Sequence, residues 1–200
     1  MNKKVLIGIV GAVVVVVAGL YILKVQRDAA KWRSAEEFVK GEDKFVKDGT
    51  LTTIRFVSVV DGAVDRVQAA LWDVEHSAET VQNVKLSKLI KQEGDTKTLE
   101  MHLQASNLPL QHYTMEFTLH ASEQRIAFKT TESQFQHMEG SYQLEASPDG
   151  KRTRITYDST ARDKVAVPFP SSVLEGANRE TFVNTVRGVK KQLQSPPAGG

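Results

Sequence analysis

Apolar and polar residues alternate along six segments in the second half of the chain, and short turn-forming sequences separate them. The segments are 84–92, 97–106, 110–121, 124–131, 135–146 and 152–162. Alternation is typical of strands with one buried face, and short connections join antiparallel neighbours. The pattern therefore predicts an antiparallel meander, to which the β-rich segment 51–60 adds a seventh strand.

Two further segments show the three- and four-residue spacing of apolar positions that is typical of a helix. One follows Asp61, a residue suited to capping a helix, and its apolar positions are Val64, Val67, Leu71 and Val74. The other begins near Ser172 and Glu175, which have the spacing of a capping box, and continues to Leu193. The order of elements predicts an α+β domain of about seven strands that ends in a long helix.

A run of 19 residues without a charge extends from Val5 to Leu23. A helix of that length crosses the hydrocarbon core of a bilayer, about 30 Å thick, so the run predicts a membrane anchor. A secretory signal cleaved after Ala18 is the alternative, although the apolar run continues past that site. The basic start of the chain resembles an export signal and favours an extracytoplasmic (periplasmic) domain, whereas the Lys and Arg count favours a cytoplasmic one.

The composition excludes several classes of function. The 200 residues contain no cysteine, which excludes disulfides, thiol catalysis and thiolate-held metal clusters. Residues 1–48 carry nine Lys or Arg and six Asp or Glu, whereas residues 49–200 carry 17 and 18. The small positive excess of the chain therefore lies near the predicted anchor, where it suits anionic lipid headgroups. A basic stripe with interleaved aromatic residues, as nucleic-acid binding needs, is missing from the sequence.

These patterns divide the chain into four parts. Residues 1–24 are the expected transmembrane anchor, and residues 25–48 are a mixed-charge juxtamembrane linker or helix. Residues 49–194 form the folded domain, and the Pro- and Gly-rich residues 195–200 are expected to be a disordered tail. We expect a single-pass membrane protein with one globular domain.

The domain resembles the START-like superfamily, also called SRPBCC or helix-grip, in three stretches. They are Val59–Val67 leading into Leu71–Glu75, the pair Gly140–Leu144 and Gly150–Tyr157, and the proline-containing entry to the last helix. The superfamily includes lipid-transfer domains, coenzyme Q-binding proteins and polyketide cyclases. Two departures are Tyr142, where the family often has tryptophan, and Asp61-Gly62-Ala63, which lacks the family's usual proline.

The resemblance implies a curved antiparallel sheet wrapped around the C-terminal helix, with a cavity between them. Strand alternation together with the helix stripe selects residues whose side chains face this space. They are Leu99, Met101, Leu103, Tyr113, Met115, Phe117, Ile126, Phe128, Met138, Tyr142, Leu144, Tyr157, Asn178, Phe182 and Val186. None of them is charged, which suits a hydrophobic ligand, although a packed core without a ligand would show the same pattern.

Two loops expected at one end of the sheet are unusually apolar. They contain Leu108 and Leu110 in the first and Val167 and Phe169 in the second. In an antiparallel meander these loops lie at the same end, where they either cap the core or form a gate to the cavity that touches a bilayer.

Ionisable residues fall on the outward positions of the predicted strands. His102, His112, His120 and His137 are among them, which favours a solvated face over a surface metal pair at His102 and His112. An inward acid–base pair is therefore not expected, nor is a metal or a cofactor. The sequence predicts a membrane-anchored protein that binds a lipid, quinone or similar molecule and transfers it. A cyclase- or hydrolase-like enzyme and a ligand-free scaffold for a protein partner are the alternatives.

Overall fold

The computed structural model describes residues 30–33, 38–39, 41–105, 108–165 and 168–194. The chain divides into two compact units, Met1–Arg33 and Ser34–Gly200, and the second contains the domain discussed below. The predicted anchor lies outside the described residues. Among the residues that are described, no helix is long and apolar enough to cross a membrane.

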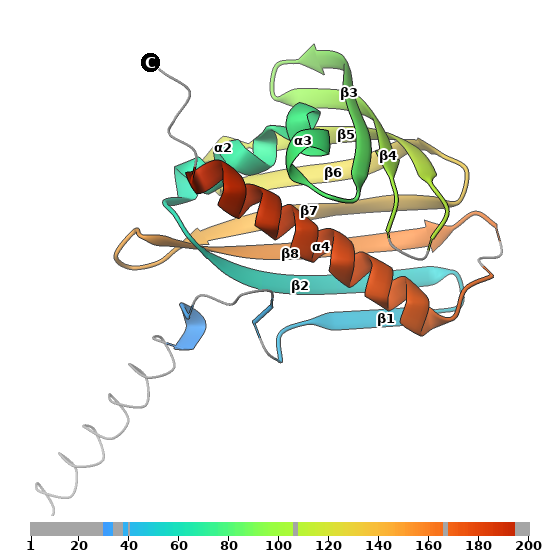
Figure 1. Ribbon diagram of the computed structural model, residues 1–200, viewed down its shortest axis with the longest axis horizontal. Helices are drawn as coiled ribbons and strands as arrows, with labels where there is room; N and C mark the ends of the chain where they lie inside the picture. Colours follow the sequence, from blue (N-terminus) through green and yellow to red (C-terminus); the bar gives the residue numbers. More distant parts are fainter. Residues whose placement is uncertain (1–29, 34–37, 40, 106–107, 166–167, 195–200) are drawn as a thin grey trace, which may run out of the picture. The chain divides into compact units, whose positions relative to one another are not determined.

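The second unit is one curved antiparallel sheet with helices on its inner face (Figure 1). The strands are β1 (Lys44–Asp48), β2 (Leu51–Asp61), β3 (Val84–Glu93), β4 (Thr96–Leu103), β5 (Gln111–His120), β6 (Arg125–Ser133), β7 (Gln136–Ala146) and β8 (Arg152–Asp163). The helices are α2 (Val64–Trp72), α3 (Ser77–Thr80) and α4 (Ser171–Gln194), with 3-10 turns η1 (Val74–His76) and η2 (Ala121–Glu123). The strand order is β1-β2-β8-β7-β6-β5-β4-β3.

The predicted meander is confirmed, with one strand more than expected. Strand β1 lies in the segment that the sequence indicated as linker, and it pairs with β2 through a tight turn at Gly49, whose φ is 57°. This five-residue segment is too short, and carries too many charges, to show a clear alternation of apolar and polar positions. The sheet therefore has eight strands in place of about seven.

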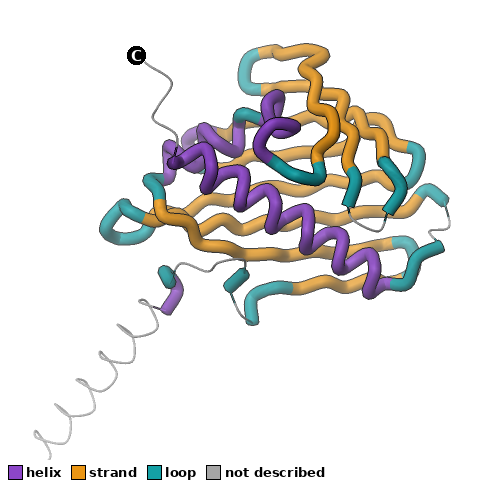
Figure 2. The backbone as a smooth tube through the Cα atoms, in the orientation of Figure 1, coloured by secondary structure: helices purple, strands orange, loops and turns teal. Residues whose placement is uncertain are grey.

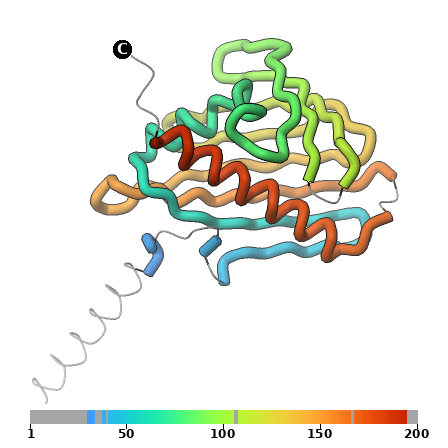
Figure 3. Tube along the Cα trace, viewed as in Figure 1, coloured from blue at the N-terminus to red at the C-terminus, as the bar shows by residue number. Residues whose placement is uncertain are grey.

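Helix α4 lies along the inner face of the sheet (Figures 2 and 3). It begins at Ser171, and the carbonyl of Pro170 accepts hydrogen bonds from the amides of Val173 and Leu174. The predicted capping box is wrong, because the helix begins at Ser171, so that Ser172 lies inside it and is not the N-cap residue. The carboxylate of Glu175 instead accepts a hydrogen bond from Arg179 at 2.8 Å, as an i,i+4 side-chain pair.

Aromatic side chains join α4 to the sheet. The ring of Phe182 on α4 lies 5.6 Å from that of Phe56 on β2 and 5.9 Å from that of Tyr157 on β8. Tyr157 in turn stacks on Phe128 of β6, with ring centroids 5.6 Å apart. These side chains belong to one buried cluster that extends across the inner face. Burial of this much aromatic surface makes the cluster the main attachment of the helix to the sheet.

Gly140 of β7 makes room for this cluster. A Cβ atom at position 140 would lie 2.7 Å from Cζ of Phe128 and 2.3 Å from the carbonyl oxygen of Asp158. The ring of Phe128 therefore occupies the space that any other residue at 140 would fill. Since the second neighbour is backbone, a side chain here is accommodated only if the strands move apart.

We predict that Gly140→Ala lowers the free energy of unfolding by about 1–3 kcal/mol, because the added methyl group overpacks the interface between β7 and β8. Urea unfolding of the purified protein measures this change. Gly176→Ala in α4 is the matched control, because a Cβ atom there meets nothing within 4 Å. The control should be neutral or stabilising, and equal stability of both variants would contradict the role assigned to Gly140.

Candidate functional site

A cavity of about 270 Å³ lies between α4 and the strand ends where the apolar loops meet. Its wall includes Leu108 and Pro109 from the β4–β5 loop, Phe135 from the β6–β7 loop, and Pro168 and Phe169 from the segment before α4. We call this space the outer chamber. The loops thus lie together at one end of the sheet, as antiparallel alternation requires.

A second cavity of about 110 Å³ lies farther along α4, between this helix and the elements α2 and α3. We call it the inner chamber. Both chambers are lined by Leu103, Met138, Tyr157 and Thr181, so they are adjacent along the helix. The inner wall is mostly apolar, with Met101, Met115, Phe117 and Phe128 from the sheet and Val189 from the helix. Methionine side chains adapt to ligands of different shape, which suits a binding space.

The structure places ten of the residues that the sequence selected in the chamber walls. Tyr113 and Asn178 line the outer chamber, Leu103, Met138 and Tyr157 line both, and the inner chamber is also lined by Met101, Met115, Phe117, Phe128 and Tyr142. Leu99, Ile126, Leu144, Phe182 and Val186 do not line either chamber and are packed in the core. Among the gate residues, Leu108 and Phe169 line the outer chamber, Leu110 is exposed, and Val167 lies outside the described residues.

Neutral polar side chains gather in the outer chamber. The hydroxyl of Tyr113 donates a hydrogen bond to Oε1 of Gln111 and accepts one from Nε2 of Gln136 at 3.0 Å. Asn178 on α4 donates to the carbonyl of Leu174 at 2.8 Å. Gln111 and Gln136 have inward positions by strand alternation, so the same pattern that selected Tyr113 and Met138 contained them. They were left out of the expected cavity residues because they are polar.

Three buried tyrosines keep their protons. Burial raises the pKa of Tyr113 to about 12 and that of Tyr157 to about 12. Burial also raises the pKa of Tyr142, against the opposing effect of a hydrogen bond with Thr185. The hydroxyl groups therefore stay neutral at physiological pH and act as hydrogen-bonding groups in the cavity wall.

A charged side chain of β4 faces inward, contrary to expectation. Lys97 shares the inward position of Leu99 on β4 and is only 5% exposed. Its ammonium group donates to both carboxylate oxygens of Glu75, at 2.8 and 2.6 Å, and to the carbonyl of Trp72 at 3.1 Å. It also lies 4.6 Å from the ring centroid of Trp72. Lys97 thus holds η1 and the end of α2 against the sheet and does not line either chamber.

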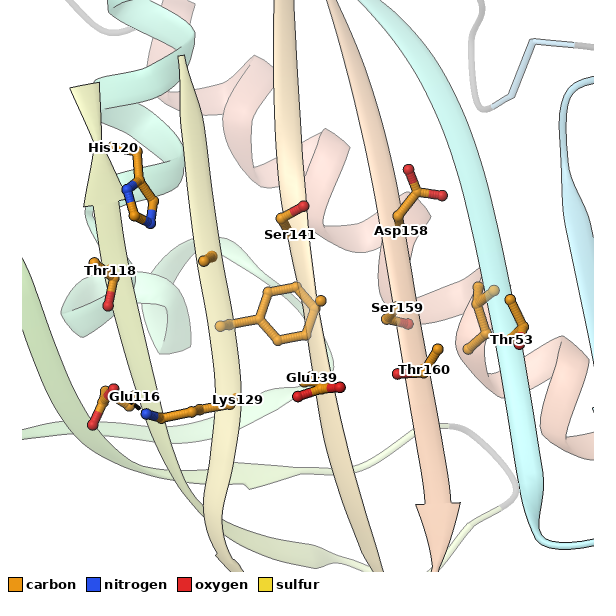
Figure 4. A pocket seen from close by; sticks show the side chains of 14 residues that line it. Thr53, Glu116, Thr118, His120, Lys129, Glu139, Ser141, Asp158, Ser159 and Thr160 are labelled. Carbon is orange, nitrogen blue, oxygen red and sulfur yellow. Dashed lines mark ion pairs between the residues drawn. The ribbon is translucent and has the colours of Figure 1, made fainter. Parts of the chain in front are cut away.

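A wider hollow of about 640 Å³ lies on the opposite face of the sheet, away from α4 (Figure 4). Its labelled side chains include Glu116 and Lys129, which form an ion pair at 2.7 Å, and Asp158, which is paired with Arg55 at 2.6 Å. Its charged groups are thus largely matched within the sheet, and the hollow is wide open to solvent. The two more enclosed chambers under α4 are therefore the better candidate for a ligand site.

The histidine pair predicted across the β4–β5 hairpin is present. His102 and His112 are register partners, their ring centroids are 4.0 Å apart, and Glu100 lies 3.0 Å from Nε2 of His102. Within the described part of the chain, the group that brings three ligand atoms within 4.8 Å of one another is elsewhere, at Asp73, Glu75 and His76. Because Glu75 is held by Lys97 and Asp73 by His76, we assign no metal to that group.

The Lys97–Glu75 pair predicts a specific dependence of stability on pH. Burial is the largest single effect and acts to raise the pKa of Glu75. The hydrogen bonds from Lys97 and the backbone, together with the charge of Lys97, outweigh it, so the pKa lies below its ordinary 4.5. A lowered pKa in the folded state stabilises the protein above the unfolded pKa, and this stabilisation is lost as pH falls through the folded value. We expect the difference in unfolding free energy between the wild type and Glu75→Gln to shrink below pH 4.5.

Lys97→Met tests the same pair from the other side. We expect it to lower the free energy of unfolding at neutral pH by about 1–3 kcal/mol, because it leaves the Glu75 carboxylate without its donor. Lys91→Met, which removes an exposed pair with Glu93, should change it by less than about 1 kcal/mol. Equal effects of the two variants would contradict the structural role of Lys97.

Comparison with known proteins agrees with this architecture. The chain superposes on an aromatase/cyclase, Zhui from Streptomyces sp. R1128, with a TM-score of 0.64 and 16% identity over 75% of this chain and 99% of that one. It superposes on a STAR-related lipid transfer protein from Xanthomonas axonopodis with a TM-score of 0.55 and 16% identity, covering 77% and 99% of the two chains.

A START superfamily protein from Mycobacterium smegmatis gives a TM-score of 0.60 at 12% identity, with 71% of this chain and 97% of that one covered. Such identities establish the fold alone. The search of curated proteins found no match to the sequence. The family model described as polyketide cyclase/dehydrase and lipid transport matches residues 60–190, which is more than half of the chain. The chain is therefore a member of the polyketide cyclase/dehydrase and lipid transport family, with a START-like fold.

Proposed function

We propose that this protein binds one hydrophobic small molecule, such as a lipid, a quinone or a polyketide-like compound, between α4 and the sheet. The observation that carries the proposal is the pair of adjacent chambers under α4. Their walls are apolar over most of their length and carry a small set of neutral polar groups at the outer end. This combination is typical of sites that bury an apolar ligand and orient it by a few hydrogen bonds.

An enzymatic role is less well supported by the wall residues. A cyclase that works by general acid–base catalysis needs an ionisable side chain near the ligand with a pKa close to the working pH. The inward lysine is held by Glu75, and burial moves the pKa values of the three tyrosines away from neutrality. Binding without chemistry is therefore the simpler function for this cavity.

A ligand-free scaffold is also less well supported. That alternative predicts a filled interior, whereas the interior between α4 and the sheet contains two chambers. A packed protein interior has few voids larger than a water molecule, so spaces of this size are best explained by a ligand.

Transfer to or from a membrane is the second part of the proposal. Exposed apolar side chains surround the outer chamber, and they include Leu51, Leu110, Phe135 and Val165. Backbone hydrogen bonds from Asp163 to Thr50 and from Lys164 to Phe135 tie three of these loops together. An apolar rim around the entrance allows a ligand to pass from lipid without crossing water.

The proposed N-terminal anchor would keep the domain at the bilayer surface. Its support is the uncharged run from Val5 to Leu23, with Lys and Arg on both sides. We propose that the domain lies outside the cytoplasm, because the short basic start of the chain resembles an export signal. Fusion of a periplasm-dependent reporter to the C-terminus tests this orientation, and a reporter active only in the cytoplasm would overturn it.

We predict that Ala177→Trp abolishes ligand binding, because Ala177 lines the outer chamber and the indole ring would fill it. The measurement is the fluorescence titration of the full chain, kept in amphipol, with the neutral dye N-phenyl-1-naphthylamine. The apparent affinity should fall about tenfold or more. Gly176→Trp, one residue away in open space on α4, is the matched control and should bind the dye like the wild type.

We also predict that the double variant Leu108→Asp, Phe169→Asp no longer takes up the dye from liposomes. Charged groups at the rim would have to lose their hydration before the rim enters the lipid interface. Leu89→Asp with Ile90→Asp is the control, because these exposed side chains lie on β3 and do not line either chamber. Unchanged uptake by the rim variant would contradict the proposed entrance.

A further inference from the structure

The cavity wall has no positive charge to offer a ligand. Among the described residues that line the two chambers there is no lysine, arginine or histidine. Residues 106–107 and 166–167 of the adjoining loops are also uncharged in sequence, being Ser, Asn, Ala and Val. A buried carboxylate or phosphate would therefore find no counter-ion here, and an unpaired buried charge is costly.

The two carboxylates in the wall already have partners. Asp163, in the outer chamber, accepts a hydrogen bond from the ammonium group of Lys47 at 2.6 Å, and both side chains are largely buried. Asp73, at the end of the inner chamber, lies 2.6 Å from Nδ1 of His76, and both are partly exposed. Each carboxylate would repel an anionic ligand, and its existing partner weakens its attraction for a cationic one.

The remaining polar side chains at the outer end are uncharged amides and hydroxyls. Gln111 and Gln136 are both engaged with the hydroxyl of Tyr113, which leaves Nε2 of Gln111 and Oε1 of Gln136 for a ligand. Asn178 uses Nδ2 for the carbonyl of Leu174, which leaves Oδ1 as an acceptor. Such a set of neutral donors and acceptors matches a hydroxyl or carbonyl group.

The volumes limit the length of the ligand. The chambers of about 270 and 110 Å³ together lie at the lower end of the roughly 300–1,000 Å³ that is typical of small-molecule sites. A single chain of about a dozen carbons, or a compact ring system, fits this space. A lipid with two long acyl chains does not.

We infer that the cavity selects an uncharged amphiphile with one chain or one compact ring system. Its hydroxyl or carbonyl head lies among Gln111, Gln136 and Asn178, and its apolar end enters the inner chamber beside Met101 and Met115. This inference rests on the proposed function and names the ligand class of the same site.

Matched ligands of one chain length provide the test. The full chain in amphipol is loaded with N-phenyl-1-naphthylamine, and 1-dodecanol, dodecanoate and dodecylamine are compared as competitors near neutral pH. We expect 1-dodecanol to displace the dye at a concentration about tenfold or more below that needed for either ion. Dodecanoate should gain affinity as pH falls toward the pKa of its carboxyl group, because the neutral acid is the binding form.

A change of charge in the wall should reverse this preference. Asn178→Lys places an ammonium group in the outer chamber, so dodecanoate should then compete better than 1-dodecanol. Gly176→Lys adds the same charge on the open side of α4 and should keep the preference of the wild type. Dilauroylglycerol, which is uncharged but has two chains, should displace the dye poorly from both variants.

The outcomes separate this inference from the function on which it rests. If the dye does not bind to the protein, the proposed function fails. If the dye and 1-dodecanol bind but dodecanoate or dodecylamine binds equally well, the selection for neutral ligands is overturned and the binding function stands. Efficient competition by dilauroylglycerol would overturn the restriction to one chain.

Discussion

The contact between Phe182 of α4 and the aromatic side chains of the sheet is the interaction on which the rest of the structure depends. Phe182 lies against Phe56 and Tyr157, and Tyr157 stacks on Phe128 above the bare backbone of Gly140. This cluster fixes the distance between helix and sheet. On α4 the outer chamber is lined between residues 174 and 181 and the inner chamber between residues 181 and 192, whereas Phe182 lines neither and is packed in the core.

Charged side chains in the interior of the domain are held by partners outside the space that a ligand would occupy. Lys97 is buried, yet its partners Glu75 and Trp72 keep it at the end of α2, and Asp163 is held by Lys47 at the edge of the sheet. Buried charges are tolerated only in such pairs. Since each of these charges is paired within the protein, the polar groups of the cavity wall that are left for a ligand are neutral, which explains why a neutral ligand suits it.

Strand alternation was sufficient to identify the inner face of the sheet but not its cavity. Leu99 and Met101 share one face of β4, yet Leu99 is packed in the core and Met101 lines the inner chamber. Alternation also places Lys97 and Gln111 on the inward face of their strands. Both were left out of the expected cavity residues because they are polar. Whether a polar inward residue pairs with its neighbours or faces a cavity depends on elements distant in sequence.

The sequence by itself determined the order of strands and helices, the meander and the apolar inner face, because periodicity and turn residues act over a few positions. It also indicated that the two apolar loops share one end of the sheet, because antiparallel strands reverse direction at every turn. The tertiary structure alone decided that β1 joins the sheet, that α4 begins at Ser171, and which inward side chains surround empty space. These features depend on how closely a helix approaches a curved sheet, and side-chain volumes from both partners set that distance together.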